Sequence, residues 1–243
     1  EPLRAPGRGL ERHQLQHAVF DALLAGEADH DALHARLRAR GLLPSGPLGR
    51  RALDDMLAEV QPYARRFAEW RGAATPADPL RIEVDIDGLR LHGRIDGVWP
   101  GGIARLRFGE PNGPSVIRNG LDWLLASAAG QGMPMFEFHE DEEGNLGPHL
   151  RNAIEPAQAK DALRVLLALR ANGLRQPLSF APRSGWKYYS AKTPERGIEE
   201  ARRQWQGGDR HWGEGGEPAW ELALRARDPF ADHDALREFI RNT

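Results

Sequence analysis

Asp96 is the residue of this sequence best placed to take part in metal chemistry. It lies in the stretch Gly93–Val98, at the end of a predicted β-strand. Mg²⁺-dependent nucleases often hold the metal with one carboxylate on a strand and an acidic-x-Lys triplet on the next strand. The next predicted strand carries Leu106 and Phe108 where the acid and the lysine would be needed. One carboxylate without a lysine makes a poor metal site, and the alternative role of Asp96 is that of a turn residue in a hairpin.

A second set of residues interleaves cations with aromatic rings in the last quarter of the chain. Such interleaving is typical of proteins that bind single-stranded nucleic acid, because bases stack on the rings and the cations follow the phosphates. The alternative is that the rings fill a core beside an irregular loop. The sequence predicts a local DNA contact at Arg183, Trp186, Lys187, Tyr188 and Lys192, with Tyr189 in the same run.

Two other charged clusters are candidate binding sites. The segment from Glu137 to Gly144 combines His139 with acids at five positions and could hold a divalent cation. A hairpin tip with solvated charges and a turn at Gly144–Asn145 is the better interpretation. Arginines also flank a glycine–proline loop, where they form either a basic face or an ordinary helix surface. These are Arg36, Arg38, Arg40, Arg50 and Arg51.

The composition suits one large globular domain, or a domain with a helical extension. The chain has 243 residues, of which 40% are hydrophobic and 28% are charged. Its 33 Lys and Arg residues nearly balance 35 acidic ones, so the net charge of −2 gives no overall attraction to DNA. Any contact with DNA must therefore be local. Cysteine is absent, which excludes disulfides and thiolate metal sites.

The sequence predicts neither a membrane span nor a targeting signal. No apolar run approaches the roughly 20 residues that cross a bilayer, and the chain does not open like a signal peptide. We therefore expect a cytoplasmic protein. Because the first residue is Glu1 and not Met, we also expect the chain to be a piece of a longer polypeptide.

Hydrophobic periodicity predicts a helical N-terminal part followed by an α/β part. Before the linker 75–79, apolar residues recur at helical spacing. After the linker they recur with a period of two, and this alternation indicates a hairpin and a third strand that together form one meander. The predicted helices are 10–25, 29–40, 50–70, 115–129 with Ser115 as N-cap, 156–172, 194–205 and one ending near 240; the predicted strands are 82–86, 89–95, 103–108 and 135–139. We expect a helical part over 1–74 and an α/β core with a mixed central sheet over 80–243, together in one compact unit.

Four stretches of the sequence, in their order and spacing, resemble the C-terminal region of RecC, the gamma subunit of the RecBCD helicase–nuclease (exodeoxyribonuclease V). They are 9–12 (GLER), 41–49 (GLLPSGPLG), 89–98 (LRLHGRIDGV) and 120–125 (GLDWLL). The resemblance is good over 1–130 and looser beyond. No single motif is diagnostic, but the ordered set is.

This resemblance implies a degenerate PD-(D/E)xK, restriction-endonuclease-like fold that handles DNA without cleaving it. His17 resembles the metal-binding histidine of active relatives and Asp96 resembles their first strand carboxylate. Leu106 and Phe108 stand where the second carboxylate and the lysine would be. We therefore expect no catalytic residue, no cofactor and at most a vestigial metal site. A lone histidine on a helix can equally be a surface or core hydrogen-bonding residue.

The resemblance also implies a scaffolding role in which the domain helps to split duplex DNA and guides single strands in double-strand-break repair. Its partners would be forked DNA and the RecB-type and RecD-type subunits. Two alternatives stay open. One is a Mg²⁺-dependent nuclease with a rearranged site at His17, Asp96 and Glu110, and the other is a protein-interaction scaffold without DNA contact.

Overall fold

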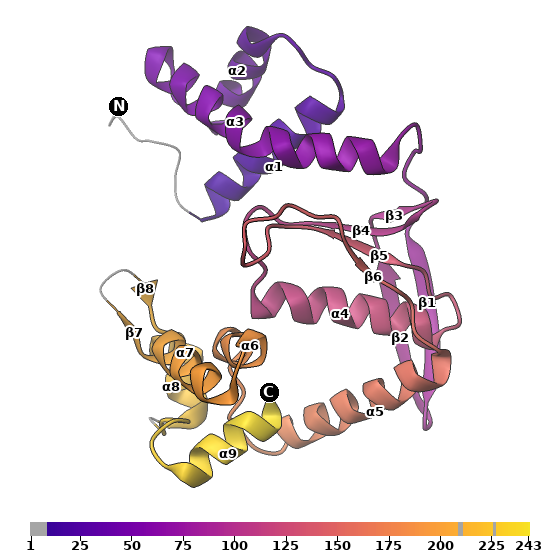
Figure 1. Cartoon of the computed structure of the whole chain (residues 1–243), viewed down its shortest axis with the longest axis vertical. Coiled ribbons are helices and arrows are strands. Elements are labelled where there is room, and N and C mark those ends of the chain that lie inside the picture. Colours follow the sequence, from indigo (N-terminus) through magenta and orange to yellow (C-terminus); the bar gives the residue numbers. More distant parts are fainter. Residues whose placement is uncertain (1–8, 209–210, 226) are drawn as a thin grey trace. The chain divides into compact units, whose positions relative to one another are not determined.

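The computed structural model divides the chain into two compact units that alternate along the sequence (Figure 1). The structure describes residues 9–208, 211–225 and 227–243. The first unit comprises the described residues up to Pro79 together with Asp96–Glu110 and Pro134–Asn152. The second unit comprises Leu80–Ile95, Pro111–Met133 and the described residues from Ala153 onward.

The first unit begins with a helical layer. Its helices are α1 (Leu10–Leu24), α2 (His30–Ala39) and α3 (Gly46–Arg71). Asp29 caps α2, because its carboxylate accepts hydrogen bonds from the backbone N–H groups of Asp31 and Ala32. All three helices were predicted, but α3 starts earlier than expected, since Pro47 is compatible with the first helical turn.

A four-stranded mixed sheet completes the first unit. The strands β3 (Val98–Trp99), β4 (Gly102–Leu106), β5 (Met135–Phe138) and β6 (His149–Arg151) follow one another in that order. β4 runs parallel to β5, with Ile103 opposite Met135, and the other pairs are antiparallel. Phe67 and Trp70 of α3 pack their rings against Phe138 of β5, which joins the helical layer to the sheet.

The predicted three-stranded meander is wrong. The hairpin β1 (Leu80–Ile86) and β2 (Leu89–Ile95) forms as expected, with a turn at Asp87–Gly88, but it is a separate two-stranded sheet of the second unit. The expected third strand is β4, which pairs with β3 and β5 instead. Gly97, at φ 67°, turns the chain after β2 so that the backbone N–H of Ala104 donates to the Gly97 carbonyl at 2.8 Å.

Helices dominate the second unit. They are α4 (Gly113–Ala128), α5 (Pro156–Gly173), α6 (Pro182–Ser190), α7 (Pro194–Gln206), α8 (Pro218–Leu224) and α9 (His233–Asn242), with the short elements β7 (Gly207–Gly208), β8 (His211–Trp212) and η1 (Glu214–Gly216). One core lies between the hairpin, α4 and α5, and a second lies among α6–α9 (Figure 1).

One local expectation for this unit was wrong, and one helix was missed. Asn112, not Ser115, is the N-cap of α4, and the two side chains form a reciprocal capping box. The sequence led to no prediction for 182–190, where the structure has α6.

The mixture of helices and small mixed sheets confirms the α/β class, whereas the PD-(D/E)xK core stays a prediction. Within the described residues, no helix is both long and apolar enough to cross a membrane.

Candidate functional site

His17 lies on α1 in the first unit, among aromatic rings. Its imidazole meets the ring of Phe108 edge-on at 5.3 Å between centroids and the ring of His13 at 4.3 Å. A cavity of about 280 Å³ adjoins it, lined also by Gln14, Asp21 and Arg40 among others. Burial lowers the pKa of His17, and His13 lowers it further, while Asp21 raises it. The surroundings thus favour the neutral imidazole.

Apolar packing surrounds Leu106 and Phe108, the residues expected from the sequence to stand in place of a second carboxylate and a lysine. Phe108 also contacts the rings of Phe20 and Tyr63, at 6.1 and 5.1 Å between centroids. Leu106 packs against the same core of the first unit. Because a charged side chain buried there without a partner would be unfavourable, these positions are built for packing and not for holding a metal.

Asp96 follows β2 and is exposed. Its backbone carbonyl accepts a hydrogen bond from Arg105 Nη1 at 2.7 Å. Glu110, the third candidate ligand, is likewise exposed, and its carbonyl accepts from Arg107 Nε at 2.5 Å. The structure therefore gives the backbones of both acids a role in shaping the turns around β4.

The Mg²⁺ that a nuclease fold implies does not fit the residues present. Among the described residues, no three His, Asp or Glu side chains gather closely enough to hold a metal ion. The position next to His17 is filled by the ring of Phe108 instead of a carboxylate or a lysine. Mg²⁺ requires oxygen-rich coordination by several ligands, and these residues do not supply it.

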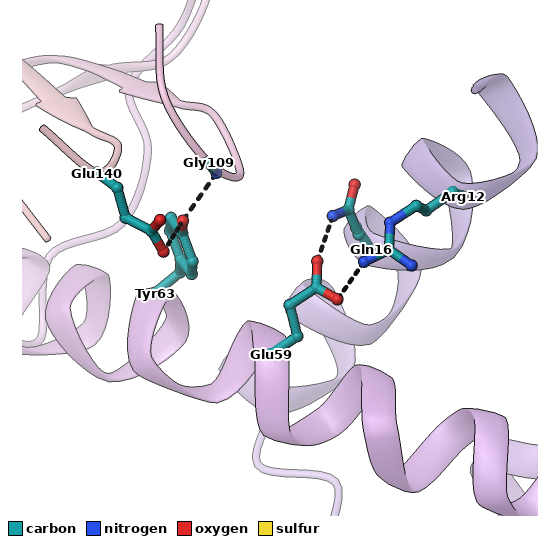
Figure 2. A network of polar contacts seen from close by, with 6 residues as sticks. All are labelled: Arg12, Gln16, Glu59, Tyr63, Gly109 and Glu140. Atoms are coloured by element: carbon teal, nitrogen blue, oxygen red, sulfur yellow. Dashed lines mark hydrogen bonds and ion pairs between the residues drawn. The ribbon is translucent and has the colours of Figure 1, made fainter. Parts of the chain in front are cut away.

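A polar network that the sequence does not reveal ties α3 to the sheet of the first unit (Figure 2). The Tyr63 hydroxyl donates to Glu140 Oε1 and accepts from the backbone N–H of Gly109, both at 2.8 Å. Burial and Glu140 raise the pKa of Tyr63 to about 12, so the hydroxyl keeps its proton. In the same view Glu59 of α3 pairs with Arg12 and accepts a 2.7 Å hydrogen bond from Gln16 Nε2, which fixes α1 on α3.

The acidic segment from Glu137 to Gly144 begins in β5 and ends in the predicted turn, where the backbone N–H of Gly144 donates to the Asp141 carbonyl. The Asp141 carboxylate accepts from the backbone N–H groups of Asn145 and Glu143, and these hydrogen bonds, chiefly those from Asn145, lower its pKa. Glu137, expected among the solvated charges, is buried and pairs with Arg151 at 3.1 Å. The segment is therefore a structural turn.

The basic residues around the glycine–proline loop are in part neutralised. Arg36 pairs with Glu27 at 2.5 Å and Arg50 with Asp31 at 3.1 Å. These contacts favour the interpretation of an ordinary helix surface over that of a binding face.

In the second unit, α6 carries the predicted cation–aromatic set except for Lys192, which lies two residues beyond the end of the helix. Arg183 and Lys187 lie one turn apart and therefore on the same side of the helix. Trp186 and Tyr189 form a tilted ring pair at 5.8 Å between centroids, and Tyr189 is 75% exposed. Tyr188 packs against the core of α6–α9 instead, as the alternative interpretation allowed.

A buried carboxylate from outside the helix fixes the start of α6. Glu214 of η1 is 3% exposed and accepts three hydrogen bonds: from the backbone N–H groups of Arg183 at 3.0 Å and Ser184 at 2.7 Å, and from Ser184 Oγ at 2.8 Å. Three residues later, Glu217 pairs with the Arg183 guanidinium at 2.7 Å. Sequence reasoning missed both acids, since neither is near α6 in the chain.

Comparison with known proteins identifies the family. The model of the RecC C-terminal domain family matches residues 1–193, so the chain belongs to this family. Among curated proteins, the chain is similar to the RecBCD enzyme subunit RecC of Escherichia coli (strain K12), at 28% identity over 181 residues. The similar region is 73% of this chain and 15% of that relative, so the chain spans only a small part of the relative's length. The matched residues include α6 but end before Glu214 and Glu217.

Proposed function

We propose that the chain is a non-catalytic DNA-handling and scaffolding domain of a RecBCD-type helicase–nuclease. Family membership supports the setting, because the similar E. coli protein is a RecBCD subunit. The observation that carries the non-catalytic part is Phe108, whose ring packs against His17 where a nuclease would need its lysine. The degenerate PD-(D/E)xK core belongs to this proposal, as do the cytoplasmic location and the RecB-type and RecD-type partners.

The proposed DNA contact is the exposed side of α6 and the residues after it. Exposed Tyr189 beside Trp186 offers a surface on which bases can stack, and Arg183, Lys187 and Lys192 supply cations for phosphates. A strand held here would be guided after a duplex is split. Because only a few cations are involved, we expect moderate affinity with a clear dependence on salt.

The test is a binding and cleavage assay on forked DNA with Mg²⁺ or Mn²⁺ across a salt series. We expect salt-sensitive binding without cleavage, and loss of binding in the double variant Arg183→Ala with Lys187→Ala. Arg237→Ala, an exposed cation on α9, is the matched control and should bind normally. Metal-dependent cleavage that disappears in Asp96→Ala would overturn the proposal in favour of a nuclease.

A pure scaffold is the second candidate, and the Arg183–Glu217 ion pair favours it, since a phosphate must compete with Glu217 for the guanidinium. Glu217→Gln separates the two functions. If Arg183 contacts DNA, releasing it should raise the affinity several-fold at low salt. If the domain only binds proteins, neither the parent chain nor this variant should bind forked DNA.

A further inference from the structure

The second unit contains a cavity whose charged lining, among the residues that the structure describes, consists of two arginines. It has a volume of about 470 Å³ and is lined by Pro177, Ala223, Arg225 and Arg227. Pro177 follows α5, and the other three residues belong to the end of α8 and the segment after it. Within the described part of the chain, no carboxylate lies within ion-pair distance of either guanidinium. Two uncompensated cations at one cavity favour an anionic ligand.

The backbone of Arg225 gives an independent indication. Arg225 follows α8 in the left-handed conformation, with φ 50° and ψ 50°. Helices commonly end with a residue in this conformation, but the residue is usually glycine because a Cβ atom is unfavourable there. A bulky arginine at such a position is uncommon, and strained residues of this kind concentrate at ligand sites. The chain thus has an arginine at a position where glycine would be less strained, which favours a role for the guanidinium.

The second arginine is held in place by the same helix end. Arg227 Nε donates to the Leu224 carbonyl at 3.2 Å, which uses one donor of the guanidinium and leaves its terminal N–H groups for a ligand. The neighbouring acid Asp228 accepts from the backbone N–H of Phe230 at 2.9 Å and does not line the cavity.

We propose that this cavity binds a phosphate monoester. Guanidinium groups bind phosphate oxygens in a bidentate manner, and the two negative charges of a monoester match the two arginines. If the domain handles DNA as proposed, the phosphate monoester would be the phosphorylated end of a strand. Only this choice of ligand rests on the proposed function. A free small phosphate has the same chemistry.

The first experiment titrates the chain with inorganic phosphate, at ionic strength held constant with chloride, and follows thermal unfolding and calorimetric heat. We expect saturable binding, weakened about tenfold or more by Arg225→Gln and by Arg227→Gln, because each removes charge-assisted hydrogen bonds. Arg237→Gln is the control that should bind as the parent chain does. No saturable binding, or binding unchanged in both cavity variants, would overturn the proposal.

Arg225→Gly distinguishes a binding role from a merely structural one. This variant removes the guanidinium and relieves the left-handed strain, so Tm without phosphate should rise by about 2 to 4 °C while the response to phosphate disappears. A response that persists in Arg225→Gly would contradict the assignment of Arg225 as a ligand.

Oligonucleotides then identify the source of the phosphate. A single strand with a 5′-phosphate is compared with the same strand carrying a 5′-hydroxyl. Tighter binding of the phosphorylated strand, lost in Arg227→Gln, supports a strand end, and an effect of inorganic phosphate alone supports a free phosphate. Equal binding of both strands that depends on Arg225 and Arg227 would place a backbone diester there and contradict the monoester. Failure of fork binding at Arg183 and Lys187 would leave the inorganic phosphate result unaffected, so the two proposals fail separately.

Discussion

Glu214 should stabilise the second unit far more than any exposed acid nearby. The change Glu214→Ala removes an acceptor that serves three donors at the start of α6. Ser184 is 0% exposed, so its backbone N–H and hydroxyl would be left buried without a partner. Each such loss costs about 1–3 kcal/mol, and the loss of a helix cap alone costs about 1 kcal/mol.

We therefore expect Glu214→Ala to lower the free energy of unfolding by about 3 kcal/mol, after allowing for the desolvation that the buried carboxylate no longer incurs. The matched control is Glu217→Ala on the same turn. Its ion pair with Arg183 is between side chains that are 42% and 48% exposed, and such pairs contribute at most about 1 kcal/mol.

The assay is hydrogen–deuterium exchange of the α6 amides, read together with urea unfolding. A loss of about 3 kcal/mol corresponds to an increase of roughly 100-fold in the exchange rate of the Ser184 amide, whereas Glu217→Ala should change it less than about tenfold. If the two variants differ by less than about 0.5 kcal/mol, Glu214 is not the cap of α6 and the reasoning is refuted.

Three further predictions concern one residue on each of α1, α3 and α4. The pKa of His17 is lower in the folded chain than its ordinary value of 6.5, so protonation of His17 favours the unfolded chain, and stability is lost as the pH falls below 6.5. His17→Gln should therefore flatten this part of a plot of the urea midpoint against pH. His13→Gln should raise the pKa of His17 in an NMR titration. Tyr63→Phe removes a hydroxyl that bridges two elements, and should lower the free energy of unfolding by about 1–2 kcal/mol with little change in circular dichroism. Gly113→Ala would bring a Cβ atom to 1.8 Å from a backbone oxygen at the start of α6 and should lower Tm strongly, whereas Gly120→Ala, with open space around it on the same helix, should raise Tm slightly.

Local patterns predicted the elements whose partners are close in sequence. The alternation from Ile82 onward and the Asp87–Gly88 turn specify the hairpin, and helical spacing specifies α1–α3. The partner of β4 could not be predicted, because a period of two shows that a strand has two faces but not which strand lies beside it. Helix α6 was missed for a related reason, since its N-terminal acceptor, Glu214, is 30 residues away in the chain.

For the candidate site too, the sequence gives the residue types but not their contacts. That Leu106 and Phe108 are apolar is evident from the sequence, and this alone predicts a poor metal site. That the Phe108 ring packs against His17 depends on α1 and β4 belonging to one unit, which only the fold reveals. Likewise, Arg183 was predicted as a DNA contact, but its ion pair with Glu217 depends on the position of η1.

The near-neutral charge of the whole chain conceals a difference between its units. The ranges of the first unit hold 14 Lys and Arg residues against 18 acidic ones, and those of the second hold 19 against 17. The net charge of each unit therefore attracts phosphate only weakly. Any binding of DNA must come from individual cations that have no carboxylate partner. Arg225 and Arg227 meet that condition among the described residues, as Lys187 on α6 does, whereas Arg183 does not until Glu217 is displaced. On this argument, a phosphate monoester should be captured first at the cavity after α8, where two such cations lie together, and Arg183 of α6 should contribute only when a bound strand competes with Glu217 for its guanidinium.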